Sequence, residues 1–141
     1  MSGRLAEKLS RRASAFLREA RRHFEEGEYD LAVFAAGQAA ELTVKRGLLI
    51  LFGDYPRIHT IRSLLSLLIR KLEEAGLHEA AKPLLDYAEK RRSSLLIMED
   101  AWSGARYEFM EYPKHVAEKV IEAAEELMRL MDSVVGSARG S

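Results

Sequence analysis

The chain has 141 residues, of which 48% are hydrophobic and 31% charged, and its formal net charge is zero. These values suit one globular, soluble domain that buries a core without disulfide or metal staples. The absence of cysteine excludes disulfides, thiolate chemistry and cysteine metal sites, and apolar runs such as residues 48–52 are far too short to cross a bilayer.

Charge is unevenly distributed along the chain. Residues 1–22 carry seven Arg and Lys against two Glu, residues 57–71 carry four cations and no acid, and residues 98–132 carry nine acids against four cations. The basic and acidic parts are expected to attract each other within the fold or between subunits, to form an RNA-facing surface, or to be solvated faces.

The start of the chain lacks the apolar region of a signal peptide, so the expected location is the cytoplasm. Asn is absent and Gln38 is the only glutamine, beside abundant Arg, Glu and Lys. Such depletion of thermolabile side chains indicates a thermophilic source.

The first predicted helix covers residues 2–26 and ends at Gly27. Its apolar side chains recur every three or four positions: Leu5, Leu9, Ala13, Phe16, Leu17, Ala20 and Phe24. The short connection to the next helix predicts an antiparallel hairpin.

The second predicted helix, residues 29–51, is the centre around which the others should pack. One line along it carries larger side chains and another carries small ones, so we expect it to be buried on two sides. The small line consists of Ala32, Ala36, Ala39, Ala40, Thr43 and Gly47. The larger line consists of Leu31, Phe34, Ala35, Gln38, Leu42, Lys45 and Leu49. Glu41 and Lys45 stand four positions apart, the spacing of an intrahelical ion pair.

A third helix is expected to begin at residues 59–60, with Thr60 as N-cap. It is expected to end before Gly76, which suits the C′ position. Its predicted buried stripe is Ile61, Leu64, Leu65, Leu68 and Leu72. A fourth helix is expected from residue 77 or 78 to residue 98, with Pro83 in its first turn or at a kink.

Helical periodicity fails between residues 99 and 113, where we expect an irregular segment. A fifth helix follows Pro113, and residues 136–141 are expected to be a disordered tail. The prediction is therefore an all-α, antiparallel up-and-down bundle of about five helices in a single domain, residues 1–135. No signature repeats at a fixed period, which argues against a helical solenoid.

The chain resembles the HEPN domain family over nearly its whole length, and three segments are the most specific parts of this resemblance. They are QAAELTVK at residues 38–45, the turn formed by Pro56, His59 and Thr60, and Ala105-Arg106-Tyr107. The resemblance implies a five-helix bundle that forms homodimers or higher homo-oligomers and has a nucleotide-binding role. It further implies a minimal nucleotidyltransferase partner, with the two proteins acting as a toxin–antitoxin-like pair.

Active members of that family are metal-independent ribonucleases with an Arg, four to six further residues and a His near the last helix. Here the nearest pair is Arg106 and His115, which are separated by eight residues including Pro113. The sequence is closer to the branch with an Ala-Arg-Tyr segment, although Glu108 stands where that branch usually has Pro. The usual catalytic motif is thus absent.

Arg106 and Tyr107 have two open interpretations. They can form a nucleotide or RNA pocket, with Arg on phosphate and aromatic rings stacking on a base. Alternatively, aromatic side chains pin this segment across the end of the bundle, with Arg106 paired to an acid such as Glu41. His59 also has two open interpretations. It either donates to a ligand or acts as a base, or it hydrogen-bonds the backbone or caps a helix. His115 is expected at the surface.

The resemblance therefore implies a regulatory and interaction module that works with a nucleotidyltransferase and binds a nucleotide. Its ligand-binding residues are expected to be Glu41, Lys45, His59, Arg106 and Tyr107. One alternative is a metal-independent endoribonuclease that uses Arg106 with His115 or His59, and another is a non-catalytic RNA-binding bundle that uses the basic first helix. Four scattered His give no metal-site pattern, no cofactor is expected, and nothing indicates DNA or a membrane.

Overall fold

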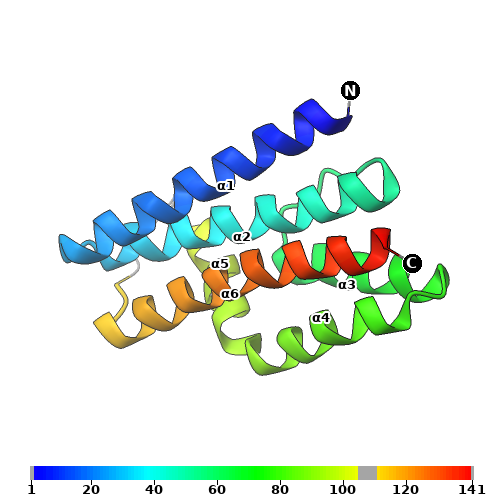
Figure 1. Cartoon of the computed structure of the whole chain (residues 1–141). Coiled ribbons are helices and arrows are strands. Elements are labelled where there is room, and N and C mark those ends of the chain that lie inside the picture. The colour runs from blue at the N-terminus through cyan, green and yellow to red at the C-terminus, as the bar shows by residue number, and fades with distance from the viewer. Residues whose placement is uncertain (1, 105–110, 141) are drawn as a thin grey trace.

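The computed structural model describes residues 2–104 and 111–140, which form helices with no strand among them (Figure 1). The helices are α1 (Ser2–Glu25), α2 (Tyr29–Phe52), α3 (Ile61–Glu74), α4 (His78–Lys90), α5 (Arg92–Gly104) and α6 (Lys114–Arg139). The all-helical prediction is confirmed, with six helices in the described residues where about five were expected. None of these helices is both long and apolar enough to cross a membrane.

α1 and α2 form the predicted antiparallel hairpin (Figure 1). Gly27 ends α1 with φ of 77°, a left-handed conformation that glycine adopts without a steric penalty. Ala13 and Ala20 are buried, whereas Leu5, near the start of α1, is 39% exposed. The first turns of α1 therefore extend beyond the main core.

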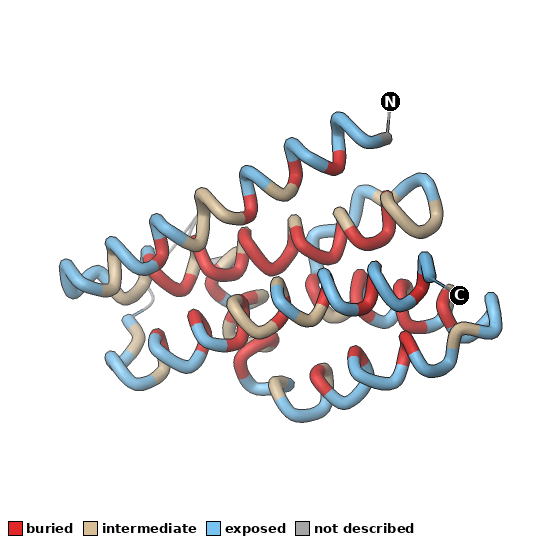
Figure 2. The backbone as a smooth tube through the Cα atoms, in the orientation of Figure 1, coloured by how far each residue is buried: buried red, intermediate tan, exposed pale blue. Residues whose placement is uncertain are grey.

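α2 lies at the centre of the bundle, and most of its residues are buried (Figure 2). Every residue of the small line is buried. A Cβ added at Gly47 would lie 2.5 Å from Met131 Sδ, so glycine lets α6 approach closely here. The larger line is covered less completely than expected, because Leu31 is 45% exposed and Phe34 and Leu42 are only partly buried.

α3 begins where the sequence predicted, and its entire expected stripe is buried. Thr60 occupies the N-cap position, but its side chain makes no capping hydrogen bond. Instead, the backbone N–H of Arg62 donates to Glu99 Oε2 at 3.0 Å. A carboxylate from α5 thus satisfies one of the N–H groups that the start of a helix leaves without a helical partner.

The predicted fourth helix is in fact two helices that change direction at Arg91. Between Ala88 and Leu95 no apolar side chain continues the buried stripe, because residues 89–94 read EKRRSS. The break lets α5 bury Leu95, Met98 and Ala101, and it places Met98 against Gly37 of α2. The expectation of an irregular segment is wrong for residues 99–104, because these residues belong to α5. Pro83 lies inside α4, beyond the expected first turn.

α6 starts directly after Pro113, as predicted, and packs against α2. The expectation of a disordered tail from residue 136 is wrong for the described part, because α6 continues to Arg139. Ala138, only 9% exposed, extends the buried face of Val134 and Val135 by one further turn. Burial of this face stabilises the last turn despite the Gly and Ser residues around it.

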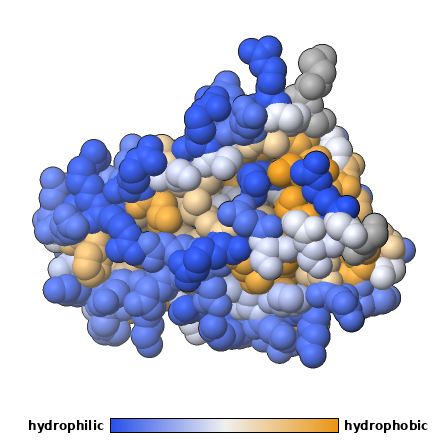
Figure 3. Space-filling model, in the orientation of Figure 1, coloured by the Kyte–Doolittle hydropathy of each residue, from blue (hydrophilic) through white to orange (hydrophobic). Residues whose placement is uncertain are grey.

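The opposite charges of the basic and acidic parts meet within the fold. Arg21 of α1 pairs with Glu125 of α6, and Arg62 of α3 pairs with Glu99 of α5 at 3.0 Å. Hydrophilic side chains cover most of the face shown in Figure 3, and apolar ones gather near the end of α2.

Candidate functional site

α2 carries two buried charges of opposite sign. Glu41 is 6% and Lys45 7% exposed, and Lys45 Nζ donates to Glu41 Oε2 at 2.8 Å. Their spacing of four residues gives the predicted intrahelical ion pair. In the interior, both charges must be paired to offset the loss of hydration, so each requires the other.

His59, from the turn before α3, completes this pair. Its Nδ1 lies 3.0 Å from Glu41 Oε2 and 3.5 Å from Lys45 Nζ. Because the ammonium group can only donate, the consistent arrangement has Nδ1–H and Nζ–H both donating to the Glu41 carboxylate. In the neutral ring the second nitrogen, Nε2, is then an acceptor, and the side chain is 52% exposed.

Trp102 of α5 stacks on the His59 ring, with ring centroids 5.5 Å apart and planes 14° from parallel. His59, Trp102 and Gln38 line a crevice of about 10 Å³ above Glu41. That volume is about the size of one water molecule, so a larger ligand must lie on the rim. The rim is formed by a flat indole, an imidazole and a buried carboxylate.

The structure thus brings together three of the predicted site residues, Glu41, Lys45 and His59. Arg106 and Tyr107 lie outside the described residues. The interpretation that Arg106 pairs with Glu41 therefore remains a prediction, although Glu41 already accepts hydrogen bonds from two other side chains.

His115 lies elsewhere. It is exposed in the first turn of α6, and the preceding Lys114 has its Nζ 5.9 Å from the centroid of Phe24, at the α1–α2 turn. Glu41 is twelve residues along α2 from Tyr29, which corresponds to about 18 Å. The structure therefore does not bring His115 to the cluster of Glu41, Lys45 and His59 within one chain.

Glu99 of α5 fixes Arg62 beside the same crevice. Arg62 Nε donates to Glu99 Oε2 and its Nη2 to Glu99 Oε1, both at 3.0 Å. The hydrogen bond and the charge of Glu99 raise the pKa of Arg62. This bidentate contact ties the start of α3 to α5 and holds Trp102, three residues after Glu99, near His59.

A second polar cluster joins α4 to α6. Glu126 accepts from Lys90 Nζ at 2.8 Å and Arg91 Nε at 2.7 Å. Burial opposes ionisation of Glu126, but the hydrogen bonds from Lys90 and Arg91 outweigh it, so the pKa is lowered. Nearby, the buried Tyr87 hydroxyl donates to the Ala123 carbonyl at 2.6 Å, and burial with the charge of Glu126 raises its pKa.

Tyr112 precedes α6, and burial and the charges of Asp100 and Asp30 raise its pKa.

Within residues 2–104 and 111–140, no three His, Asp or Glu side chains gather as a metal would require. The expectation that no metal is bound remains a prediction.

The partners that shape the site were hard to predict from the sequence. Trp102 falls in the segment expected to be irregular, so its stacking on His59 could be found only once α5 was recognised as a helix. Glu99 and Arg62 are 37 positions apart, so no local spacing links them. The run of three cations at residues 90–92 followed by two Ser was the one available signal for the break before α5.

A comparison with protein families gives one match that spans almost the whole chain. Residues 6–134 match the model described as HEPN domain. No curated protein and no solved structure matches the chain. The chain therefore belongs to the HEPN domain family, and this membership supports a nucleotide-binding or ribonuclease-type module.

Proposed function

We propose that this HEPN domain is a regulatory and interaction module that binds a nucleotide on the rim around His59 and Trp102. The observation that carries the proposal is the contact between His59 and Glu41. A carboxylate that is 6% exposed orients an imidazole that is 52% exposed, so the polar edge of the ring is fixed at the surface.

The rim offers the two kinds of contact that a nucleotide requires. Nε2 of His59 accepts a hydrogen bond from a base or a ribose hydroxyl. The indole of Trp102 adds a flat apolar surface, on which a base stacks for about 1–3 kcal/mol. Arg106 and Tyr107 are included in the proposal for their chemistry, as a phosphate partner and a second aromatic ring.

The test is calorimetric titration of the protein with AMP and ATP, comparing wild type with His59→Ala. The control is His115→Ala, which removes an exposed histidine far from the rim. We expect binding that weakens about five- to tenfold in His59→Ala, as for loss of one buried hydrogen bond, and is unchanged in His115→Ala. Equal affinities in all three proteins would refute this site.

A second candidate, metal-independent ribonuclease activity, is favoured by the same carboxylate–histidine contact. With Nδ1–H held by Glu41, Nε2 is placed to accept the proton of a ribose 2′-hydroxyl. The 2′-oxygen attacks phosphorus, the bond to the 5′-oxygen breaks, and that oxygen takes up a proton. Arg106 would stabilise the phosphorane, a cationic role that its guanidinium group can fill.

Cleavage of a labelled, structured RNA in the presence of a chelator tests this candidate. Wild-type cleavage that falls 10²–10⁴-fold in His59→Ala, and not in His115→Ala, would support it, since that is the usual contribution of a general base. Cleavage lost only in His115→Ala would assign the base to α6 instead. No cleavage at high protein concentration would leave the binding module.

We also propose that the chain pairs with a second copy through α1 and α2. A groove of about 370 Å³ runs between these helices, and its lining includes Arg12, Phe16 and Glu19 of α1 with Leu42 of α2. Arg12 and Glu19 lie about 10 Å apart along α1. In an antiparallel, two-fold contact centred near Phe16, Arg12 of one copy would face Glu19 of the other.

Sedimentation of charge variants tests this pairing. Arg12→Glu should shift the protein toward monomer, and the reversed pair Arg12→Glu with Glu19→Arg should restore the dimer. Failure of the reversed pair to restore association would exclude this contact.

The proposed nucleotidyltransferase partner rests on the resemblance alone, and co-expression with a nucleotidyltransferase encoded beside this protein would test it.

A further inference from the structure

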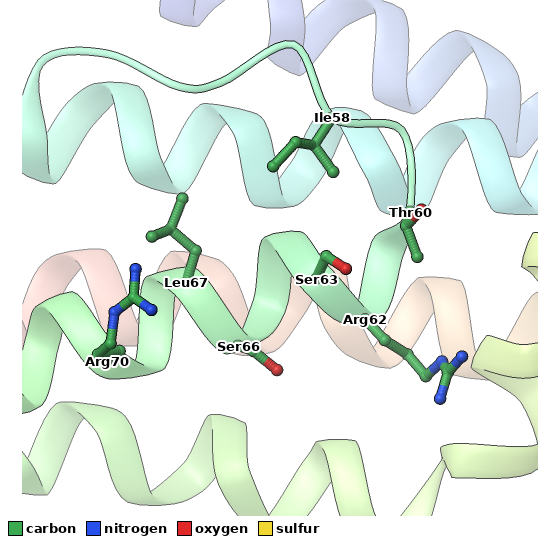
Figure 4. A pocket seen from close by; sticks show the side chains of 7 residues that line it. All are labelled: Ile58, Thr60, Arg62, Ser63, Ser66, Leu67 and Arg70. Carbon is green, nitrogen blue, oxygen red and sulfur yellow. The ribbon is translucent and has the colours of Figure 1, made fainter.

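A groove along the outer face of α3 has features of a second site (Figure 4). Its volume is about 510 Å³, within the range of small-molecule sites. α3 contributes Arg62, Ser63, Ser66, Leu67 and Arg70, and the preceding loop contributes Ile58 and Thr60. The groove thus combines hydrogen-bond donors with two apolar walls.

The donors lie along one side of α3. Ser63 and Ser66 stand on successive turns between Arg62 and Arg70, whose guanidinium groups lie at opposite ends of the groove (Figure 4). Arg62 and Arg70 are eight residues apart, or about 12 Å along the helix. Thr60 adds a hydroxyl group that makes no capping hydrogen bond.

The two arginines differ in their charge balance. Arg62 is neutralised and oriented by Glu99. Arg70 is exposed, forms no ion pair with any residue in the described ranges, and lies in a stretch from residue 57 to 71 without an acid. Glu73 and Glu74, in the last turn of α3, stand three and four positions after Arg70, and neither forms an ion pair with it. The groove therefore carries one guanidinium group that forms no ion pair among the described residues, beside the hydroxyl groups of Ser63 and Ser66.

We propose that this groove binds the phosphate group of a small phosphate ester. Arg70 would hold the phosphate, Ser63 and Ser66 would donate to its remaining oxygens, and Ile58 and Leu67 would contact the apolar part of the ester. One free guanidinium suits one phosphate group better than a polyanion. The inference is independent of the rim around His59, because none of its residues belongs to that cluster.

Calorimetric titration with inorganic phosphate, AMP and a single-stranded oligo(U) tests the groove. Arg70→Gln should weaken phosphate and AMP binding about tenfold or more, as for loss of a charged hydrogen bond, and Ser63→Ala with Ser66→Ala about fivefold. The matched control is Arg92→Gln, an arginine that lines a neighbouring groove together with Glu89. Circular dichroism would verify that these exposed substitutions leave the helices intact.

Each outcome decides the proposal. Binding of phosphate and AMP that falls in Arg70→Gln and not in Arg92→Gln supports it. Binding of oligo(U) alone, with the same dependence on Arg70, assigns the phosphate to a polynucleotide backbone. Equal losses in Arg70→Gln and Arg92→Gln, or no binding of any probe by wild type, overturn it. His59→Ala in the same titrations separates this site from the proposed rim, since it should leave inorganic phosphate binding unchanged.

Discussion

Two carboxylates in this molecule each accept hydrogen bonds from two basic side chains, yet they serve different ends. Glu126 binds Lys90 and Arg91 and joins α4 to α6 at the surface. Glu41 binds Lys45 of its own helix and His59 of the following turn, and it is almost completely buried. One contact ties two helices together, while the other holds a titratable ring at the edge of the core.

The difference lies in the partners. Lys90 and Arg91 carry permanent charges near water, where ion pairs contribute little to stability. Lys45 is confined to the interior, and Glu41 is its only ion-pair partner within the part of the chain that the structure describes. His59 is half exposed and gains a defined orientation from Glu41, which suits it to contact a ligand. Burial thus makes the carboxylate of an ordinary ion pair a support for the half-exposed His59 ring.

The largest expected effect comes from Glu41→Ala. It leaves Lys45 buried without its carboxylate, which should lower the free energy of unfolding by about 3–5 kcal/mol. Urea denaturation followed by circular dichroism measures the change. A loss below about 1 kcal/mol would indicate that Lys45 reaches water easily and that the buried pair has little structural weight.

The double variant Glu41→Leu with Lys45→Met is the control for that experiment. Replacing a buried ion pair by apolar side chains of similar volume is often neutral or stabilising. We expect stability near that of wild type with His59 no longer oriented. Loss of nucleotide binding in this stable protein would separate the role of Glu41 at the site from its role in folding.

A smaller effect is expected at the α4–α6 contact from Tyr87→Phe. It removes the hydroxyl that donates to Ala123 and should cost about 1 kcal/mol in urea denaturation. The raised pKa of Tyr87 means that its contribution is present below the ordinary tyrosine value of 10.0 and is lost as the pH rises further. The variant should therefore lose less stability than wild type between neutral pH and strongly alkaline pH, and parallel curves would contradict this.

Glu126→Gln should change the acid dependence of stability. Because the pKa of Glu126 is lowered in the folded protein, its stabilisation is present above the ordinary value of 4.5 and is lost as the pH falls through the folded value. The urea midpoint of the variant should therefore fall less than that of wild type on acidification from neutral pH. At neutral pH the difference should be at most about 1 kcal/mol.

The smallest effect on stability is expected from His59→Ala, below about 0.5 kcal/mol, because the ring is half exposed and Lys45 keeps its partner. A cost of 2 kcal/mol or more in urea denaturation would make His59 a structural residue. If His59→Ala costs little stability but loses nucleotide binding, His59 serves the proposed site. Tyr87, in contrast, serves the stability of the fold.

The sequence predicted much of the helical framework because local rules determine it. Gly27, Gly53 and Gly76 end helices with positive φ, and the buried stripe of α3 follows its periodicity closely. The ion pair of Glu41 and Lys45 was also predictable, since both residues belong to one helix. In contrast, the break at Arg91 was missed because Leu84, Ala88 and Leu95 fit one continuous helical face.

The site was predictable only in part, because its contacts join distant segments. Glu41 meets His59 across 18 positions, and Glu99 meets Arg62 across 37. The resemblance to the family gathered Glu41, Lys45 and His59, whereas periodicity alone indicated only the first two. Trp102 and Glu99 could not be placed until α5 was known to turn back toward α2.

The small cluster formed by Ala6, Leu9 and Leu49 has a consequence for motion. These residues attach the first turns of α1 and are separate from the main core, which includes Ala20 further along the same helix. A segment with so few buried contacts opens locally at less cost than global unfolding. Backbone amides at the start of α1 should therefore exchange with deuterium sooner than those of α2. A second copy bound over α1 would slow that exchange, which makes the rate a direct report on association.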